Sequence, residues 1–250
     1  MPAISPLRVS FLSATKSESD SNLNFIEMPA NATEPLTEAT QHYLREIYKL
    51  EAAGSRATTT NVAEAMEVSA ASASTMLKRL ATLGLVEHVP YRGVALTDRG
   101  RLAALEVIRH HRLLEQYLAE RLGVPLEQVH GEADRLEHAL SEEVEKRIDA
   151  LLGYPTHDPH GHPIPDAELR LEPAIDNRTV ASLQPGDTAR VADVPDDDAE
   201  LLSYLHSLGL VPGRRIEVIA NAPFGGPVSF RTEEGEHAIA RELAHSIGIA

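Results

Sequence analysis

Apolar residues in the first part of the chain recur every three or four positions, which is the spacing of amphipathic helices. The pattern predicts a helix over residues 37–53, where Thr37 is in position to cap the first turn. It predicts a short helix over 61–67 and a third helix over 70–83, with Ser69 as the cap of the third.

The second of these helices is expected to begin at a capping box, because Asn61 is followed three residues later by Glu64. Polar and apolar residues then alternate over 85–96, with a turn at 91–93, which predicts a two-stranded wing. A short helix, a turn, a second helix and a wing are typical of a winged helix-turn-helix, here assigned to residues 35–100.

Helical spacing returns after the wing and predicts helices over 97–122, 126–130 and 132–152. Their leucines form more apolar stripes than one small domain needs, so residues 101–153 are interpreted as a helical dimerisation and metal-binding domain. An intramolecular core without a dimer is the alternative. The leucines concerned are Leu102, Leu105, Leu113, Leu114, Leu118, Leu136, Leu140 and Leu151.

Residues 154–178 are rich in proline and histidine and are interpreted as a loop that runs into a linker. The histidines there are His157, His160 and His162, and loop packing is the preferred interpretation over metal binding. Residues 179–250 combine short predicted strands with one helix, which favours a small SH3-like barrel. The expected elements are a turn and strand within 183–194, a helix over 198–209, and strands over 214–220, 227–231 and 236–240. The predicted fold is therefore mostly α in its N-terminal two-thirds, followed by a small SH3-like β-barrel domain.

The composition narrows the possible environments and chemistry. The chain has 250 residues and no cysteine, so disulfides and thiolate metal sites are excluded. No apolar run approaches the length that spans a membrane, and the N-terminus lacks the pattern of a signal peptide, so a cytoplasmic protein is expected. Residues 1–34 show no lasting periodicity and are expected to form a disordered tail.

Charge is distributed unevenly along the chain, whose formal net charge is −15. Residues 56–112 hold eight basic and five acidic residues, a local charge of +3, whereas the segments on either side are acidic. This distribution fits a protein that contacts DNA through one module.

Histidines and carboxylates recur at helical offsets in the segment after the wing. Asp134, Glu137 and His138 stand at i, i+3 and i+4, while His111 and Glu115 stand at i and i+4. Together with His130, these side chains predict one or two metal sites between helices. A solvated polar helix face is the alternative. Carboxylate and imidazole ligands suit Mn²⁺ or Fe²⁺, with Mn²⁺ preferred, and no added base or nucleophile stands out, which argues against an enzyme.

The third helix begins with small side chains that permit close approach to the major groove of DNA. Candidate DNA-contacting residues in this region are Thr59, Ser69, Ala71, Ser72 and Thr75. Of these, Ser72 and Thr75 can hydrogen-bond to bases, and Ala71 can contact a thymine methyl group. Candidate phosphate contacts are Lys78, Arg79 and, at the wing, Arg92, because phosphate contacts position the protein without reading sequence. Capping and ordinary helix-surface roles are the alternative for the small residues, and plain surface charge is the alternative for Arg92.

Four stretches carry a resemblance to a known family: 42–50, the wing 91–97, 110–115 and 129–144. In this order they resemble the diphtheria-toxin-repressor family of metal-dependent transcriptional repressors of iron or manganese homeostasis. The C-terminal part is similar to that family's SH3-like, FeoA-type domain. The resemblance spans about residues 37–250.

The resemblance implies two ligand sets. The primary set comprises His42, Asp134, Glu137 and His138, and the ancillary set comprises His111, Glu115 and His130. The family adds ancillary ligands from the SH3-like domain, for which Asp198 and Glu200 are the candidates. Asp134 stands where the iron branch has cysteine and the manganese branch has glutamate. Arg45 stands where the two-metal site of the manganese branch has another glutamate, which departs from that branch.

The expected function is metal-dependent repression, with a homodimer binding palindromic double-stranded operator DNA when Mn²⁺ or Fe²⁺ is bound. Two alternatives remain. A winged-helix regulator that responds to a small molecule, with structural metal, would bind its operator without added metal. A helical metalloenzyme would turn over a substrate at the metal site.

Overall fold

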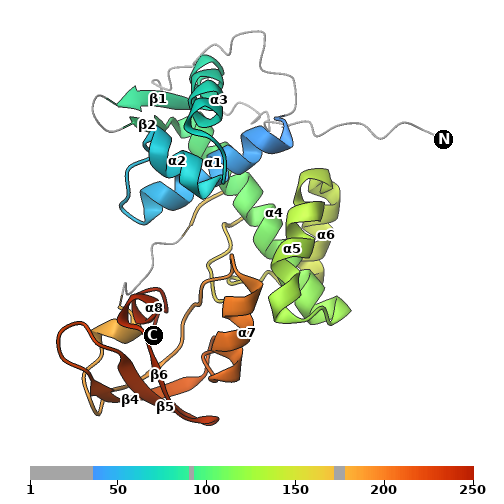
Figure 1. The fold of residues 1–250 in the computed structure, drawn as a ribbon. Helices are drawn as coiled ribbons and strands as arrows, with labels where there is room; N and C mark the ends of the chain where they lie inside the picture. The colour runs from blue at the N-terminus through green and yellow to red at the C-terminus, as the bar shows by residue number, and fades with distance from the viewer. Residues whose placement is uncertain (1–35, 90–92, 172–177) are drawn as a thin grey trace, which may run out of the picture. The chain divides into compact units, whose positions relative to one another are not determined.

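The computed structural model describes residues 36–89, 93–171 and 178–250 (Figure 1). The predicted tail and the candidate contact Arg92 lie outside these residues. The chain divides into two compact units, with the boundary between Ala95 and Leu96, and they are described in turn.

The first unit is the helix-turn-helix with its wing. It comprises α1 (Glu38–Ala52), α2 (Thr59–Ala65), α3 (Ala70–Thr82) and a two-stranded sheet of β1 (Val86–Val89) and β2 (Gly93–Leu96). The predicted caps of the first and third helices are confirmed. The Thr37 side chain accepts a hydrogen bond from the Thr40 amide, and the Ser69 side chain accepts one from the Ser72 amide.

The predicted start of the second helix is wrong by two residues. Thr58 is the N-cap, and its hydroxyl accepts the amide hydrogen of Asn61 at 3.1 Å. The Asn61 side chain instead donates to the carbonyl of Arg56 at 2.9 Å. Thr58 and Asn61 are both good capping residues and stand three positions apart, so the sequence alone allows either start.

Gly93 attaches the wing to the turn before α2. Its φ is +94°, and a Cβ there would lie 2.3 Å from the Ala57 carbonyl oxygen. The Val94 amide donates to the same carbonyl at 3.0 Å. A glycine is needed at this close approach, since other residues would be both strained and in collision.

The second unit begins with three helices, of which the first agrees with the sequence prediction and the other two differ from it. Helix α4 (Asp98–Leu122) matches its prediction, and α5 (Leu126–Leu136) is longer than expected. The continuous helix predicted over 132–152 is wrong: a 3₁₀ turn, η1 (Glu137–Ala139), follows α5, and α6 (Glu142–Leu152) starts anew. Leu140 is extended and Ser141 caps α6 by accepting the Val144 amide hydrogen, which is why the helix breaks there.

The helices share one apolar core, and further apolar side chains remain outside it. The core comprises Leu113, Leu114, Leu118, Val129, Ala133, Leu140, Ile148 and Ile164. The large apolar side chains left exposed along this stretch are Leu102, Leu122, Leu136, Val144, Leu151 and Tyr154.

Arg109 ties α4 to α6 and to the proline-rich loop. Its Nε donates to Glu145 Oε1 at 2.5 Å and its Nη2 to Asp149 Oδ2 at 2.6 Å. Its Nη1 donates to the Pro165 carbonyl at 2.7 Å. The guanidinium is only 4% exposed, so each of its donors needs such a partner, and the loop is held against the helices.

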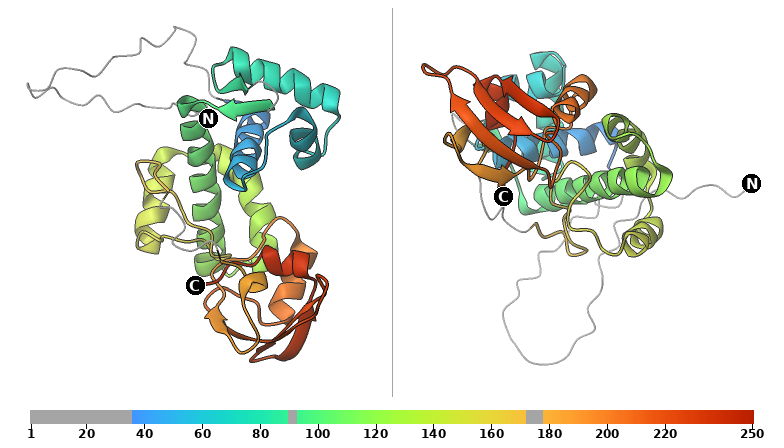
Figure 2. Two further views of the ribbon diagram at one scale, coloured as in Figure 1. Left: turned by 90° about the vertical axis from the view of Figure 1, so that its left-hand side faces the viewer. Right: turned by 90° about the horizontal axis from the view of Figure 1, so that it is seen from below.

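The rest of the second unit is the small β domain. A four-stranded antiparallel sheet has the order β3 (Thr188–Arg190), β4 (Arg215–Asn221), β5 (Val228–Thr232) and β6 (Gly235–Ile239). Helix α7 (Ala199–Ser207) lies beside the sheet in both views of Figure 2. Its other short helices are η2 (Val180–Ser182) and α8 (Arg241–His245), neither of which the sequence pattern predicted.

The fully buried Phe230 side chain lies at the centre of this domain's core. The sheet and helices give the SH3-like arrangement that was predicted. Within the described residues, no helix combines the length and apolar character that a membrane span requires.

Candidate metal centre and DNA-contact surface

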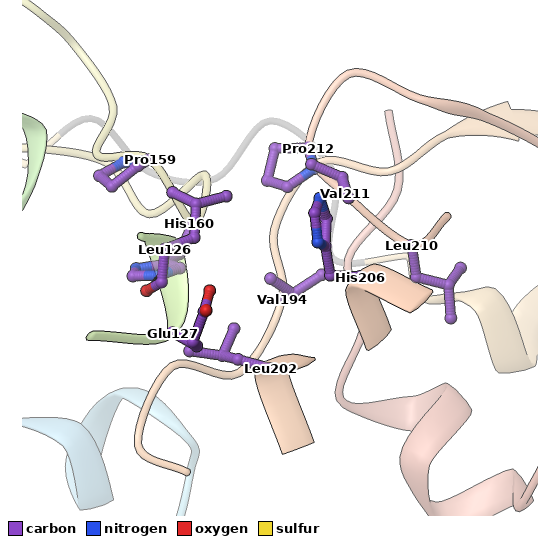
Figure 3. A pocket seen from close by; sticks show the side chains of 10 residues that line it. All are labelled: Leu126, Glu127, Pro159, His160, Val194, Leu202, His206, Leu210, Val211 and Pro212. Atoms are coloured by element: carbon purple, nitrogen blue, oxygen red, sulfur yellow. Dashed lines mark hydrogen bonds between the residues drawn. The ribbon is translucent and has the colours of Figure 1, made fainter. Parts of the chain in front are cut away.

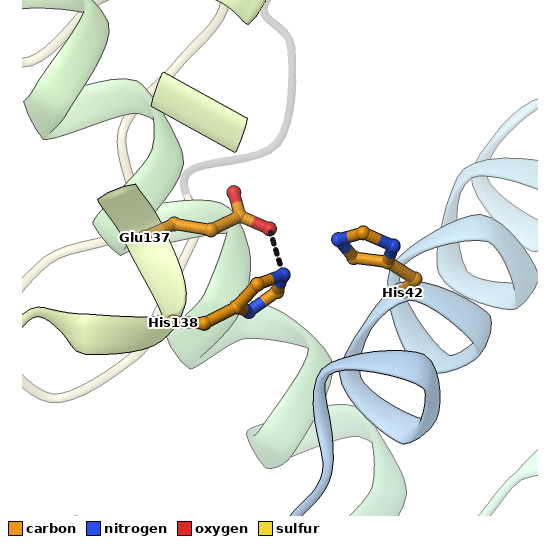
Figure 4. Close-up of side chains that lie close together, drawn as sticks. All are labelled: His42, Glu137 and His138. Carbon is orange, nitrogen blue, oxygen red and sulfur yellow. Dashed lines mark ion pairs between the residues drawn. The ribbon is translucent and has the colours of Figure 1, made fainter. Parts of the chain in front are cut away.

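The residues of the second unit that were predicted as primary ligands lie where α5 gives way to η1. Asp134 is on α5, while Glu137 and His138 are on the 3₁₀ turn. Glu137 is buried, and His138 Nε2 lies 3.5 Å from Glu137 Oε1 (Figure 4). The figure also draws His42, which α1 carries in the first unit.

The predicted ancillary residues also lie together. His111 and Glu115 are one turn apart on α4, with His111 Nε2 3.0 Å from Glu115 Oε1. His130, from α5, places Nδ1 3.1 Å from the same oxygen. The three side chains can therefore offer ligand atoms to one cation.

The resemblance assigned His111 to the ancillary set alone, but in the structure its ring also contacts carboxylates of the primary set. Its Nδ1 lies 2.6 Å from Glu137 Oε2 and 3.4 Å from an oxygen of Asp134. Its Nε2 faces Glu115 on the other side. One imidazole ring thus contacts carboxylates of both sets.

A further group of potential ligands surrounds the same Glu115 carboxylate. Asp158, His160 and Asp196 have ligand atoms within 4.8 Å of one another and of Glu115. His160 Nδ1 lies 3.7 Å from Glu115 Oε1, and the His160 ring is only 1% exposed. We call Glu115, Asp158, His160 and Asp196 the loop set, since two of its members come from the proline-rich loop.

The local fold of the loop turns Asp158 and His160 toward Glu115. Asp158 Oδ1 accepts the amide hydrogens of His160 and His162, both at 2.9 Å, while Oδ2 lies 3.4 Å from His162 Nδ1 and 3.6 Å from Arg112 Nε. His160 Nε2 donates to the Leu126 carbonyl at 3.3 Å, so Nδ1 faces the carboxylates. Hydrogen bonding of the remote ring nitrogen to a carbonyl is how proteins orient histidine ligands.

The acidic residues of the SH3-like domain nearest to the site differ from those anticipated. Asp198 caps α7 by accepting the Glu200 and Leu201 amide hydrogens. The oxygens that approach His130 belong to Asp196, at 3.9 Å from Nδ1, and to Asp197, at 4.0 Å from Nε2. One oxygen of the Asp198 carboxylate, Oδ1, is therefore used by the helix cap.

Charges in the cluster balance through protons on histidine rings. Burial disfavours a charged His111, but the Glu115 and Glu137 carboxylates outweigh burial and raise the pKa of His111 to about 10. Burial likewise opposes a charged Glu115, yet the surrounding histidines hold its pKa well below its usual range. For His162, Asp158 and Asp196 overcome burial and raise the pKa to about 10.

We expect the affinity for Mn²⁺ to rise with pH across roughly pH 6 to 8. The raised pKa of His111 keeps a proton on its ring throughout that range, and a ligand must lose its proton to bind metal. Each proton released should contribute up to about tenfold in affinity per pH unit. Titration calorimetry in buffers of different ionisation enthalpy measures the protons released. A pH-independent affinity with no proton release would contradict this expectation.

Besides the spacing of its ligand atoms, the loop set has buried polar atoms that suit a cation. Glu115 Oε2, Asp158 Oδ2 and His160 Nδ1 are buried and make no hydrogen bond within the part of the chain that the structure describes, although Asp158 Oδ2 also lies within ion-pair distance of Arg112 and His162. Buried polar atoms without hydrogen bonds are rare and call for a partner such as an ion. These atoms are oxygens and an imidazole nitrogen, the donors that divalent transition metals accept.

Helix α3 presents the residues expected to face DNA. Ala71, Ser72, Thr75, Lys78 and Arg79 are all exposed. Small residues occupy its first turns and the basic pair follows, as a helix needs in order to approach the major groove closely.

Hydroxyls at this helix already have local partners, including that of Ser72, which lies 2.9 Å from the Ser69 hydroxyl. Ser69 caps α3, and the Thr75 hydroxyl donates to the Ala71 carbonyl at 2.9 Å. Thr59 is the first residue of α2 and is half-buried.

Three family models match consecutive parts of the chain. They are the N-terminal DNA binding domain of the iron dependent repressors at residues 35–94, their metal binding and dimerisation domain at 97–166, and the FeoA domain at 178–250. The order agrees with the domain order seen in the structure.

Individual relatives match nearly end to end. The chain is 33% identical over 225 residues to the iron-dependent repressor IdeR of Mycobacterium tuberculosis (strain ATCC 25618 / H37Rv), which covers 86% of this chain and 97% of IdeR. A solved manganese-dependent transcriptional repressor in complex with manganese is 38% identical, covers 84% of this chain and 99% of its own, and has a TM-score of 0.78. ScaR with bound Cd²⁺ is 31% identical, with coverages of 84% and 98% and a TM-score of 0.76.

A DNA-reading helix pair with a wing, followed by helices that gather histidines and carboxylates, defines a metal-responsive DNA-binding regulator. The chain belongs to the iron-dependent, or diphtheria-toxin, repressor family and is a metal-dependent transcriptional repressor of the iron- or manganese-responsive kind, not an enzyme. Its DNA-binding and dimerisation domains imply operator DNA and a second copy of the chain as partners.

Proposed function

We propose that this repressor responds to Mn²⁺ ahead of Fe²⁺, binds palindromic operators as a two-fold dimer and controls manganese homeostasis. The observation that supports manganese is the chemistry of the ligands. Every side chain in the metal-ligand groups is a carboxylate or an imidazole, and the chain has no cysteine. Hard oxygen donors favour Mn²⁺, whereas a thiolate would shift preference toward softer ions.

The proposed primary ligands are His42, Asp134, Glu137 and His138, and the proposed ancillary ligands are His111, Glu115 and His130. The loop set adds Asp158, His160 and Asp196 around the same Glu115. When bound, a divalent cation supplies positive charge that offsets the repulsion among these carboxylates. His42 is included because the resemblance places it in the family's primary set.

The proposed primary set draws on both units of the chain. His42 belongs to α1 of the DNA-binding unit, whereas Asp134, Glu137 and His138 belong to the second unit. Ligands shared in this way favour those arrangements of the two units in which all four can bind together. If those arrangements also bind DNA best, operator DNA must tighten metal binding by the same factor.

The dimer is proposed to form through α4, α5 and α6. Support comes from the large apolar side chains that these helices leave exposed, Leu102, Leu136 and Leu151 among them. A two-fold dimer reads a palindrome whose half-sites are separated by whole helical turns.

Operator binding measured against a panel of divalent metals at controlled free concentration tests the proposal. We expect binding to require metal, with Mn²⁺ most effective at matched free concentration and Fe²⁺ second. Equal operator affinity in excess chelator and in Mn²⁺ would contradict it and would favour a regulator that responds to a small molecule. Turnover of a substrate at the metal site would favour the metalloenzyme.

We expect two α3 variants to separate positioning from sequence reading. Lys78→Ala should weaken binding to all DNA sequences and reduce the dependence of affinity on salt, because a phosphate contact is lost. Thr75→Ala should instead change the preference among operator variants by about 1–3 kcal/mol at one position. Salt-dependent binding to operator and random DNA measures both. Parental affinity and salt dependence in Lys78→Ala would remove this residue from the interface.

A further inference from the structure

A pocket of about 320 Å³ opens beside the metal ligands, between α5 and the segment that leads into α7. We call it the acidic pocket. Its lining residues are Glu127, Gln128, His130, Gly131, Glu132, Arg135, Asp196, Asp197 and Ala199.

The acidic pocket borders the cluster on the side where ligand side chains reach solvent. The His130 side chain is 16% exposed and that of Asp196 13%, and both line the pocket. Glu115 and Asp158 have no exposed side-chain surface, and His160 has 1%. His130 and Asp196 are therefore the most exposed members of the ancillary and loop sets, and a cation that arrives through the pocket meets them before the inner residues.

A second cavity, which shares Glu127 with the acidic pocket, is much smaller. Leu126 and Pro159 face Val194 and Leu202 there across a cavity of only about 20 Å³, which His160 also lines (Figure 3). Such a space holds about one water molecule. Its walls are mostly apolar, with Glu127, His160 and His206 as polar members, and a space of this size has no room for a hydrated cation.

Charge in the acidic pocket favours cations. Four carboxylates line it against one basic residue, Arg135, and that residue is paired with Glu132 on the same helix. Glu127 and Glu132 belong to none of the ligand groups found among the described residues. A cleft lined by one sign of charge concentrates counter-ions and speeds their association.

We propose that the acidic pocket is the route by which a hydrated divalent cation enters and leaves the ancillary and loop ligands. Glu127 and Glu132 attract the ion without binding it in its final position, and His130 with Asp196 is the first ligand pair it meets. This inference rests on the proposed metal binding and concerns the path and the rate, not the affinity.

Gly131 allows the route to be blocked without touching a ligand. It lies on α5 in the pocket wall, and a Cβ there would meet no atom within 4 Å. Gly131→Phe places a bulky ring in the pocket, and Gly131→Ala is the matched control, because both remove the glycine but only one fills the space. The full-length protein is loaded with Mn²⁺ in stopped-flow experiments, and release is then started with excess chelator. The phase that Glu115→Gln abolishes identifies the ancillary and loop ligands.

We expect Gly131→Phe to slow both loading and release by at least about fivefold relative to Gly131→Ala, with the dissociation constant unchanged within about twofold. Raised salt should slow loading in the parent, and less so in a Glu127→Gln, Glu132→Gln double variant. Rates equal to those of the alanine control would overturn the proposal.

If Gly131→Phe weakens the affinity for Mn²⁺, the phenylalanine ring disturbs the ligands. The Mn²⁺ loading and release rates of Ala199→Phe, on another wall of the pocket, then test the route. Parental rates in that variant would overturn the proposal too. A chain that binds no Mn²⁺ at equilibrium would refute the proposed function itself, which is a different result from unchanged rates.

Discussion

Glu137→Ala is expected to lose metal-triggered operator binding. The free Mn²⁺ concentration needed for half-maximal operator binding should rise by more than the roughly 10–100-fold that loss of an outer-shell partner typically causes. The carboxylate is 1% exposed and contacts the rings of both His111 and His138. Its removal takes a negative charge from the primary set and leaves both rings without that partner. A Mn²⁺ titration of operator binding measures the loss.

Glu143→Ala is the matched control, since this exposed α6 carboxylate pairs only with nearby Arg147 among the interactions described. It should behave like the parent. His130→Ala should retain a weakened metal response, because His130 mainly serves the ancillary side. A parental response in Glu137→Ala, together with a lost response in His130→Ala, would reverse the roles given to the two sets.

Glu115→Gln is expected to remove metal from the ancillary and loop ligands while the primary set still binds. Glu115 is fully buried, and its Oε1 lies near His111, His130 and His160. The amide keeps the size of the side chain but loses its charge, and one of its two positions becomes a donor that repels a cation. Metal content after dialysis at fixed free Mn²⁺ should fall to the amount that the primary set holds.

Glu120→Gln, at an exposed position further along α4, provides the comparison and should leave the metal content unchanged. If Glu115→Gln bound as much Mn²⁺ as the parent with the same affinity, neither the ancillary nor the loop ligands would form a metal site.

The sequence predicts the start of a helix correctly where a single strong capping residue precedes it. Thr37, Ser69 and Thr97 each begin a helix at the predicted place, because their side chains accept amide hydrogens that the first turn leaves unpaired. The break between η1 and α6 was missed although Ser141 carries the same kind of signal. The apolar periodicity continues across this break, and periodicity alone predicts one unbroken helix.

The candidate site was predictable only where its residues lie on the same or neighbouring helices. His111 with Glu115, and Asp134 with Glu137 and His138, could be grouped by their offsets along a helix. Asp158 and His160 could not, since their approach to Glu115 depends on an irregular loop. Asp196 comes from another domain altogether. The proline-rich run did contain the signal, three histidines and an aspartate, but helical periodicity cannot place such residues.

The His111 ring lies between the primary and ancillary sets, with one nitrogen facing each. A neutral imidazole has one N–H and one lone pair. If Nε2 binds an ion beside Glu115, Nδ1 carries the hydrogen and donates to Glu137, and the reverse choice exchanges these roles. An ion bound at one ring nitrogen therefore determines whether the other nitrogen carries a hydrogen or a lone pair. If the two proposed sets bind metal, the binding constant of each depends on the occupancy of the other, and titrations should be fitted with a shared-ligand scheme in place of two independent sites.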